Sequence, residues 1–580
     1  METTQNQAAP LQSKSAAIPA FAANRTQLAA AVYSYLLGWF YWRGVWLGNP
    51  LAPFSGYYVG MFHPIVLGVF CLLFFGGAAF FLRRVKRPAT TESWCWLGFS
   101  LLLLADILLI RPLFFGKNYY LGQYDPYNYG FYGWEVFALH LAAMYWLVCR
   151  AGLLTGGKTG FFAPVDALSA LVGRPFRWIF LRIQVVVWAI KSLYNRHKSK
   201  SAAPKRDVTE AVVGLCILIP LFLMALLLLM GADSGFAQAF HGIFDRLWLP
   251  DVVARELMQF VVSLPVGAYL YGAIGSALSQ SPDPQKQQRW QASLEKSRFL
   301  PQKVMTLGVG LFCLLYLLFF VVQVSYLIPS LFGTLPQGFV ASDYARQGFF
   351  QLCAVVVLNF GVLLLALLLV KGSVQTNSSL RVMLTALLTA NLLFVVVSAA
   401  KMGLYVSLYG ITDKRILSSW VMLVLAVVTV LAMRNLFHPF DWVRHSVFVA
   451  AGLFLALCLC QPQALSYKAN LALYKSGVIS QLDGWTLARQ YGGGSRYAFA
   501  CDLMDAGWGK GLSAQEIRDV ITGYSGNQIY YHIGEQGQRQ VYVVLYDAPD
   551  GQPWAVLMNI TDDEMTKGLE LVPLSRLKQQ

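Results

Sequence analysis

Long apolar stretches separated by short polar segments run through most of the chain. Most of these stretches are about 18 to 25 residues long, the length that a helix needs to cross the hydrocarbon core of a bilayer. A large soluble core would need far more polar surface than they leave. We therefore expect about eleven membrane-crossing helices, over residues 29–47, 58–82, 94–115, 134–154, 211–230, 258–278, 304–327, 349–370, 381–405, 416–433 and 447–459.

The predicted fold class is an α-helical polytopic membrane bundle with a small C-terminal α+β domain. The transmembrane domain covers residues 29–461, and the hydrophilic C-terminal domain covers residues 462–580. The first crossing carries Arg43 near its end, and the last is short for a full crossing. Residues 1–28 form a polar tail without a cleavable signal pattern, so the first apolar segment is expected to act as an uncleaved anchor.

The C-terminal domain contains local signals for helices and strands. "LSAQEIRDVITGY" starts with a serine cap and has Glu516 three residues later, which predicts a short helix. "QVYVVLYDAPDGQPWAVLMNI" predicts a strand, a turn and a second strand. "ITDDEMTKGLEL" predicts the start of another short helix.

Composition supports membrane residence. Hydrophobic residues make up 57% of the chain and charged residues only 13%, about half the usual share in a globular protein. The mean hydropathy is +0.51. The lipid bilayer is therefore the first expected partner.

The net charge of +16 comes largely from Lys and Arg beside the apolar stretches. The cluster Arg83, Arg84, Lys86 and Arg87 follows the second crossing directly. Because cytoplasmic loops of membrane proteins carry an excess of Lys and Arg, topology explains this charge, and no nucleic-acid partner is expected. With the N-terminus inside, eleven crossings place the C-terminal domain outside, although "TDKR" at 412–415 then also lies outside, against the rule.

Residues 155–209 form a long basic loop. Within it, apolar residues from Leu168 to Leu193 recur mostly at spacings of three and four, as on one face of a helix. One interpretation is an interfacial helix that binds anionic lipid of the inner leaflet. The alternative is a cytosolic helix that packs on other loops.

Just before the eighth crossing, "DYARQGFFQL" places an arginine between aromatic residues. The candidate interface residues are Tyr344, Arg346, Gly348, Phe349 and Phe350. Arg346 fits an anchor that sets the depth of the helix in the membrane. It also fits a site for an anion or a lipid headgroup, since guanidinium binds phosphate and stacks on aromatic rings.

This stretch resembles a family of bacterial polytopic membrane proteins, the domain of unknown function 4173, which is related to 4153. "SAAKMGLYVSLYGITDKR" is similar to a second element of that family, with departures at Lys401 and Ile411. "NLALYKSGVISQLD" is a third, weaker likeness, and together they span roughly residues 95–485. The resemblance implies a multi-pass protein of the bacterial cytoplasmic membrane, and it carries over no activity.

Ionisable and amide side chains within the crossings are candidate functional residues, because such groups are costly in a membrane. The candidate intramembrane polar site consists of Asp106, His140, Lys401 and Asn359. Asp106 could pair with Lys401 across helices, or it could relay protons with His140. The simpler alternative is structural pairing that fixes helix contacts, and an amide such as Asn359 often does only that.

The sequence shows no catalytic arrangement. It contains no phosphate-binding glycine loop, no His-Glu-x-x-His and no serine elbow, and the spacing of its nine cysteines suggests neither a metal site nor a disulfide framework. No cofactor and no metal are expected, and an enzymatic role is disfavoured.

Three functional classes stay open at this point. The leading hypothesis is a non-enzymatic envelope signalling or scaffold component whose C-terminal domain presents a binding surface. The alternative is a secondary transporter or exporter that uses the intramembrane charges. A third is an enzyme acting on lipid-linked substrates.

Overall fold

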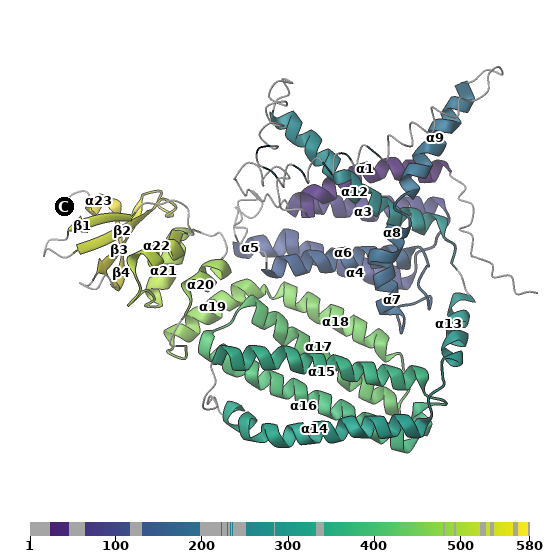
Figure 1. The fold of residues 1–580 in the computed structure, drawn as a ribbon. Helices are drawn as coiled ribbons and strands as arrows, with labels where there is room; N and C mark the ends of the chain where they lie inside the picture. The colour runs from purple at the N-terminus through teal and green to yellow at the C-terminus, as the bar shows by residue number, and fades with distance from the viewer. Residues whose placement is uncertain are drawn as a thin grey trace, which may run out of the picture.

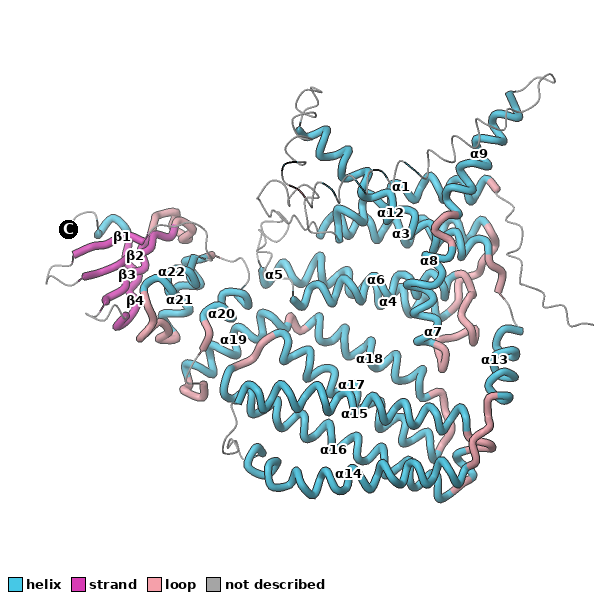
Figure 2. Tube along the Cα trace, viewed as in Figure 1, coloured by secondary structure: helices cyan, strands magenta, loops and turns pink. Residues whose placement is uncertain are grey.

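The fold is described from a computed structural model. The structure describes residues 24–45, 64–115, 130–197, 251–282, 285–331, 341–479, 482–491, 495–522, 529–533, 539–560 and 566–577, with a few single residues between 218 and 235. Helices dominate, and the described strands lie only in the C-terminal part of the chain (Figure 2).

Among the described residues, eight helices are long and apolar enough to cross a bilayer. They are Pro64–Arg84, Thr91–Phe114, Gln259–Ser279, Gln302–Val322, Phe350–Leu369, Ser378–Tyr409, Asp413–Phe437 and Trp442–Leu459. The expected count of about eleven crossings is thus not confirmed. Residues 25–45 and 130–150 also form helices, but they are not among the eight, and residues 211–230 lie almost entirely outside the described part.

The first bundle consists of α1 (Arg25–Val45), α3 (Pro64–Arg84), α4 (Thr91–Ala105), α6 (Gly130–Arg150) and α12 (Asp251–Ser279). Helix α4 continues through a π-helical turn, η1 (Asp106–Ile110), into α5 (Arg111–Phe115). Helices α1 and α12 touch backbone to backbone, because a Cβ on Gly38 would lie 2.8 Å from the backbone of Gly267. Small residues allow such close approach where no hydrophobic effect drives helices together.

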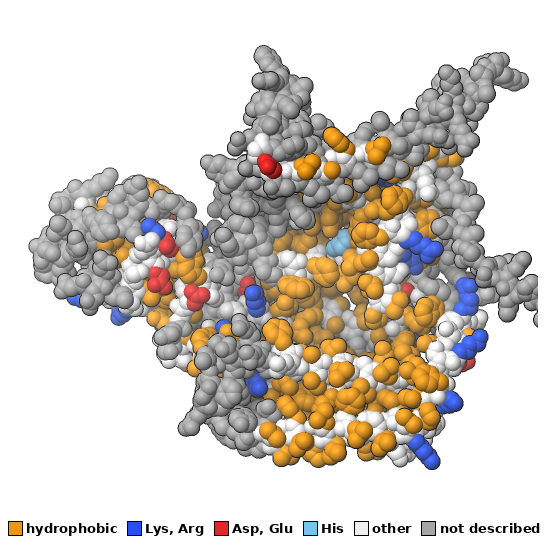
Figure 3. Space-filling model, in the orientation of Figure 1, with side chains coloured by type: hydrophobic (Ala, Val, Ile, Leu, Met, Phe, Trp, Pro, Cys, Tyr) orange, Lys and Arg blue, Asp and Glu red, His pale blue; other side chains and the backbone are white. Residues whose placement is uncertain are grey.

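The second bundle consists of α14 (Gln302–Leu331), α15 (Ala341–Leu369), α16 (Ser378–Tyr409) and α17 (Asp413–Phe437). Its core centres on α16, where Leu387, Leu388 and Phe394 are buried. Helix α18 (Trp442–Leu459) packs on α17 and on α4, so it joins the two bundles (Figure 1). Apolar side chains cover the face of the second bundle seen in Figure 3, as expected for a lipid-facing surface.

The predicted basic loop folds into short helices at one end of the bundles. These are α7 (Ala163–Leu168), the π-helical η4 (Ser169–Gly173), α8 (Arg174–Arg177) and α9 (Leu181–His197), and the next connector holds α13 (Gln285–Lys296). Helix α9 packs on α1 and α12, while Phe176, Phe180 and Trp188 stay exposed. These contacts are with bundle helices and not with other loops, so they do not match the cytosolic alternative. Binding of anionic lipid by this segment stays a prediction.

The C-terminal part begins with α19 (Pro462–Lys475), α20 (Gly484–Tyr491), α21 (Arg496–Asp505) and α22 (Ala514–Thr522). A four-stranded antiparallel sheet follows in sequential order, β1 (Ile529–Ile533), β2 (Arg539–Leu545), β3 (Trp554–Ile560) and β4 (Thr566–Pro573), before the short α23 (Leu574–Leu577). Buried residues of the helices, such as Leu487, Phe499 and Ile517, form one core with Val543 and Val556 of the sheet. Figure 1 shows this part at the end of the bundles opposite to α7 and α13.

Two local predictions for this domain are confirmed and one is wrong. The Ser513 hydroxyl accepts a hydrogen bond from the Glu516 backbone N–H (3.3 Å) at the start of α22, and β2 and β3 form the predicted strand pair. Residues 566–573 form strand β4, where a helix was predicted. Pairing with β3 outweighs the local acidic signal for a helix start.

Candidate functional site

Four polar side chains from three distant segments meet in the interior of the first bundle. Arg111 is ion-paired with Glu135, and its Nη2 lies 3.9 Å from Oδ2 of Asp106. Gln461 donates through Nε2 to both carboxylate oxygens of Asp106, at 2.8 and 3.0 Å. The ring centroid of Tyr132 lies 5.1 Å from Cζ of Arg111. We call Asp106, Arg111, Glu135 and Gln461 the charge cluster.

Local backbone irregularities bring these groups together. The π-helical turn η1 starts at Asp106, and it inserts one extra residue per turn between Asp106 and Arg111. Gln461 stands between α18 and α19 in a left-handed conformation with φ of 47°. A non-glycine residue in this conformation costs about 1–2 kcal/mol. The hydrogen bonds of the buried Gln461 side chain offset that cost.

The charge cluster has two carboxyl groups for one guanidinium. No donor among the described residues reaches Oε1 of Glu135, and this carboxyl lies within hydrogen-bonding reach of Asp106. Two carboxyl groups can share a hydrogen bond only when one of them carries a proton. The arrangement can therefore hold one proton between Asp106 and Glu135, which makes the cluster electrically neutral.

His140 lies elsewhere in the first bundle, between two tyrosines. Its Nδ1 is 3.3 Å from the Tyr41 hydroxyl, and its Nε2 is 3.0 Å from the Tyr269 hydroxyl. The Tyr269 hydroxyl in turn donates to the Leu171 carbonyl oxygen at 2.8 Å. These contacts link α6 with α1 and α12 and do not include Asp106.

Asn359 and Lys401 belong to the second bundle. Asn359 accepts a hydrogen bond from the Tyr316 hydroxyl (2.6 Å) and donates to Oδ1 of Asn391 (2.7 Å), so a buried polar chain ties α14, α15 and α16 together. Lys401 is buried farther along α16. Asp106, His140, Asn359 and Lys401 thus do not form one site. Asp106 interacts with Arg111, Glu135 and Gln461.

The candidate interface residues Tyr344, Arg346, Gly348, Phe349 and Phe350 fall in the first turns of α15. The side chains of the first four lie outside the described residues. Phe350 is described and exposed, which is consistent with a position facing lipid.

A second polar arrangement joins the second bundle to the C-terminal part. Asn470 of α19 accepts from the Ile411 N–H and donates to the Ile411 carbonyl oxygen, both at 2.7 Å. It also donates to Oε1 of Gln490 in α20 (2.9 Å), and Nε2 of Gln490 donates to the same Ile411 carbonyl (2.8 Å). Asn470 and Gln490 are buried. We call Ile411, Asn470 and Gln490 the Ile411 clasp.

Glycine makes the Ile411 clasp possible. Gly410 has φ of 75° and ψ of −171°, a combination that is essentially restricted to glycine. A Cβ at this position would lie 2.7 Å from Oδ1 of Asn470. The loop between α16 and α17 can therefore present both polar backbone groups of Ile411 to Asn470.

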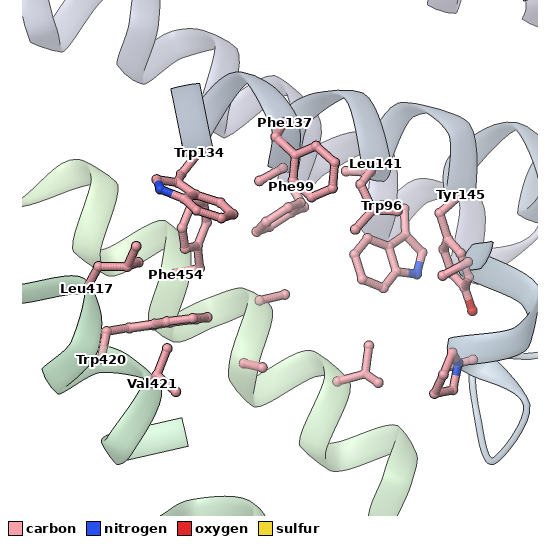
Figure 4. Close-up of a pocket in the computed structure, with 18 residues that line it drawn as sticks. Trp96, Phe99, Trp134, Phe137, Leu141, Tyr145, Leu417, Trp420, Val421 and Phe454 are labelled. Atoms are coloured by element: carbon pink, nitrogen blue, oxygen red, sulfur yellow. The ribbon is translucent and has the colours of Figure 1, made fainter. Parts of the chain in front are cut away.

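An apolar cavity of about 480 Å³ lies between the bundles. Figure 4 shows Trp134, Phe137 and Leu141 on one side, facing Trp420 and Phe454 on the other. Its volume is in the range of small-molecule sites, yet its walls offer few polar groups to orient a polar ligand.

Arg111 and Glu135 lie within the predicted third and fourth crossings, but the predicted intramembrane polar site does not include them. Sequence reasoning missed Gln461, Asn470 and Gln490 altogether. Two signals were present: a glutamine directly before a proline at the end of the last apolar stretch, and an asparagine within the third family-like element.

The comparisons with known proteins give one match. The model of the family described as "Domain of unknown function (DUF4153)" matches residues 125–491, which is more than half of the chain. The matched range contains Glu135 and ends with α20, so it includes the Ile411 clasp but not Asp106. The match to 4153 supports one of the two resemblances, and membership in 4173 is not confirmed. No curated protein and no solved structure matches the chain.

Proposed function

The chain belongs to the DUF4153 family of domains of unknown function, and on that premise we propose that it is a non-enzymatic signalling or scaffold component of the bacterial envelope. In this proposal, the helices in the cytoplasmic membrane hold the C-terminal domain at the outer face. The C-terminal domain then presents a binding surface to another envelope protein.

The observation that supports this function is the Ile411 clasp. Buried polar groups that are fully hydrogen-bonded fix one geometry, because breaking any of the bonds leaves a buried group unpaired. Beyond the clasp, the Tyr467 hydroxyl of α19 donates to Asp502 at 2.7 Å. Burial raises the pKa of Tyr467 and Asp502 adds to the shift, so this hydroxyl keeps its proton as a donor. A movement of α16 and α17 would thus be transmitted to the C-terminal domain.

The proposed orientation follows from the basic residues. Arg150 ends α6 shortly before α7 and donates to the Arg87 carbonyl, and Arg87 donates to the Gln280 carbonyl shortly before α13. Figure 1 shows the C-terminal domain at the end of the bundles opposite to α7 and α13. An excess of Lys and Arg favours the cytoplasm for the end near α7 and α13. Arg415, which breaks this rule, donates to the Tyr409 carbonyl at 2.9 Å and lies 4.0 Å from the Tyr405 ring centroid. The positive charge of Arg415 therefore interacts with the C-terminal end of α16, where a cation is favourable.

Cysteine labelling tests the orientation. Tyr546→Cys probes the C-terminal domain, where Tyr546 is 70% exposed, and Lys158→Cys probes the opposite end. Both are made in a background in which the native cysteines are replaced. An impermeant maleimide added to intact spheroplasts should label only the cysteine at 546. Labelling only of the cysteine at 158 would reverse the orientation and exclude an outer binding surface.

Cross-linking in cells tests the function. A photoreactive residue at Tyr546 should give a discrete adduct with another envelope protein. Gly410→Ala should abolish the adduct while the C-terminal domain stays folded, and Gly477→Ala is the matched control, because its added Cβ meets no atom within 4 Å. Absence of adducts at Tyr546 and at other exposed positions, such as Glu570, would contradict the proposal.

A second candidate function is a proton-coupled transporter or exporter, and the contact between Asp106 and Glu135 favours it. A buried carboxyl pair that holds one proton can release it when the helices rearrange. Asp106→Asn should then abolish proton uptake into proteoliposomes. Ser100→Ala is the control, since Ser100 is buried in the same helix and donates to the Trp96 carbonyl one turn earlier (2.8 Å). Unchanged uptake in Asp106→Asn would remove this candidate.

A further inference from the structure

A pocket of about 340 Å³ lies where α3 and α6 end and α4 begins. Three arginines line it: Arg83 from the last turn of α3, Arg87 from the following loop and Arg150 from the last residue of α6. No carboxylate is among the residues that line it. We call this site the basic pocket.

The chain builds this pocket through an unusual turn at the end of α3. Lys86 has a left-handed backbone with φ of 56°, a place that glycine usually takes. The Lys86 N–H donates to the Arg83 carbonyl (2.9 Å), and the Arg87 N–H donates to the Leu82 carbonyl (3.0 Å). This pair of bonds ends the helix and turns Arg87 back toward Arg83.

Hydrogen bonds to carbonyl groups hold two of the guanidinium groups in place. Nη1 of Arg150 donates to the Arg87 carbonyl (2.6 Å), and Nη2 of Arg87 donates to the Gln280 carbonyl (2.5 Å). Nε of Arg87 is buried and has no hydrogen-bond partner within the described part of the chain. Arg150 is only 6% exposed, and its charge is near enough to Arg83 to be repelled by it.

Three neighbouring cations with no carboxylate in the lining are unfavourable in a partly buried site, and an anion with several oxygen atoms would relieve this. Guanidinium groups bind phosphate through paired, charge-assisted hydrogen bonds. The N-terminus of α4 opens at the same pocket, and its dipole adds positive potential. The chemistry of the basic pocket therefore favours a phosphate group.

The rest of the lining points to a lipid as the source of that phosphate. Ala79, Trp94 and Leu97 form an apolar wall along the membrane-crossing parts of α3 and α4, and Trp94 is 61% exposed. Tryptophan is enriched at the headgroup level of bilayers. Basic pockets between membrane helices are a known way to hold anionic headgroups. We infer that the basic pocket binds the headgroup phosphate of an anionic phospholipid from the adjacent leaflet.

The test measures bound lipid on the full chain. The protein is purified in detergent and loaded with phosphatidylglycerol or with phosphatidylcholine, and retained lipid is counted by native mass spectrometry. Inorganic phosphate is added in a separate arm, with the thermal unfolding midpoint as the readout. The variant is Arg83→Ala, because Arg83 is exposed, whereas the Arg87 and Arg150 side chains donate to backbone carbonyl groups that hold the turn in place. The matched control is Arg84→Ala, one residue further on α3 and outside the lining.

We expect wild type and Arg84→Ala to retain phosphatidylglycerol, and Arg83→Ala to retain it about tenfold less, the effect of one lost charged hydrogen-bonding group. Equal retention of phosphatidylcholine would overturn the preference for an anionic lipid. If inorganic phosphate raised the thermal unfolding midpoint of the wild type as much as loading with phosphatidylglycerol does, a lipid would not be the source of the bound phosphate. An equal loss in Arg84→Ala would mean that surface charge alone attracts the lipid, and it would overturn the site.

Discussion

The Ile411 clasp provides the sharpest prediction about how the two parts of the molecule are joined. The perturbation is Asn470→Ala, which removes the bonds to the Ile411 N–H, the Ile411 carbonyl and Gln490. The Ile411 carbonyl keeps its bond from Gln490 at 2.8 Å. The Ile411 N–H loses the acceptor that it has in the wild type.

The magnitude follows from these bonds. A typical intramolecular hydrogen bond contributes about 0.5–1.5 kcal/mol net, and a buried donor left unpaired costs about 1–3 kcal/mol. With one of the acceptors still satisfied, we expect the clasp to lose about 2–4 kcal/mol in its free energy of opening. That loss corresponds to roughly 30- to 1,000-fold more frequent opening.

Amide hydrogen exchange followed by mass spectrometry measures this opening, on peptides that cover residues 404–415. The Ile411 amide should exchange roughly 30- to 1,000-fold faster in Asn470→Ala than in the wild type. Amides of the C-terminal core should keep their protection, because the bond from Trp508 Nε1 to the Leu482 carbonyl (3.1 Å) and the surrounding core are untouched.

Two controls make the test decisive. Gly410→Ala should have an effect of similar size, because its Cβ would displace Asn470. Gly477→Ala imposes backbone strain at a φ of 74° without a clash, so it should leave Ile411 protected. If Asn470→Ala changed exchange at Ile411 by less than threefold, the clasp would not be what holds α19 to the second bundle.

Three further predictions concern the membrane domain. Lys86→Gly should raise the free energy of unfolding in mixed micelles by about 1 kcal/mol, because glycine adopts the left-handed backbone conformation without strain. An unchanged or lower free energy of unfolding would contradict a left-handed conformation at Lys86. Arg111→Met should lower it by about 3–5 kcal/mol by leaving two buried carboxyl groups without their cation, and a cost below about 1 kcal/mol would show that the cation is dispensable. The hydrogen bond from Lys158 lowers the pKa of Asp441, so this pair stabilises the fold above the ordinary aspartate pKa and is lost as the pH falls through the lowered value. The Tm difference between wild type and Lys158→Ala should therefore shrink between pH 6 and pH 3, and it should be small throughout because both side chains are more than half exposed; a difference that grows toward low pH would refute the pairing.

Sequence reasoning works well for features that depend on neighbouring residues. The lengths of the apolar stretches predict helices that cross a bilayer. Lipid offers no hydrogen-bond partners, so a single segment must pair its own backbone N–H and C=O groups, and a helix does this. The same holds for the serine cap of α22 and the turn between β2 and β3, whose chemistry lies within a few residues. Strand β4 shows the limit, because it exists only through its pairing with β3.

The candidate site shows which information the chain does not carry locally. Asp106 can be recognised as a charge within an apolar stretch, but its hydrogen-bond donor Gln461 is 355 residues away. Hydropathy gives each helix a membrane depth and says nothing about which helices become neighbours.

By itself, the sequence determined that the chain is a helical membrane protein with a basic end and a folded hydrophilic domain, because hydrophobic length and charge are properties of single segments. Only the tertiary structure decided that Asp106 meets Arg111, Glu135 and Gln461, and that Asn470 holds Ile411. Packing selects those partners, since buried polar groups must be satisfied by whichever side chains the neighbouring helices bring within reach.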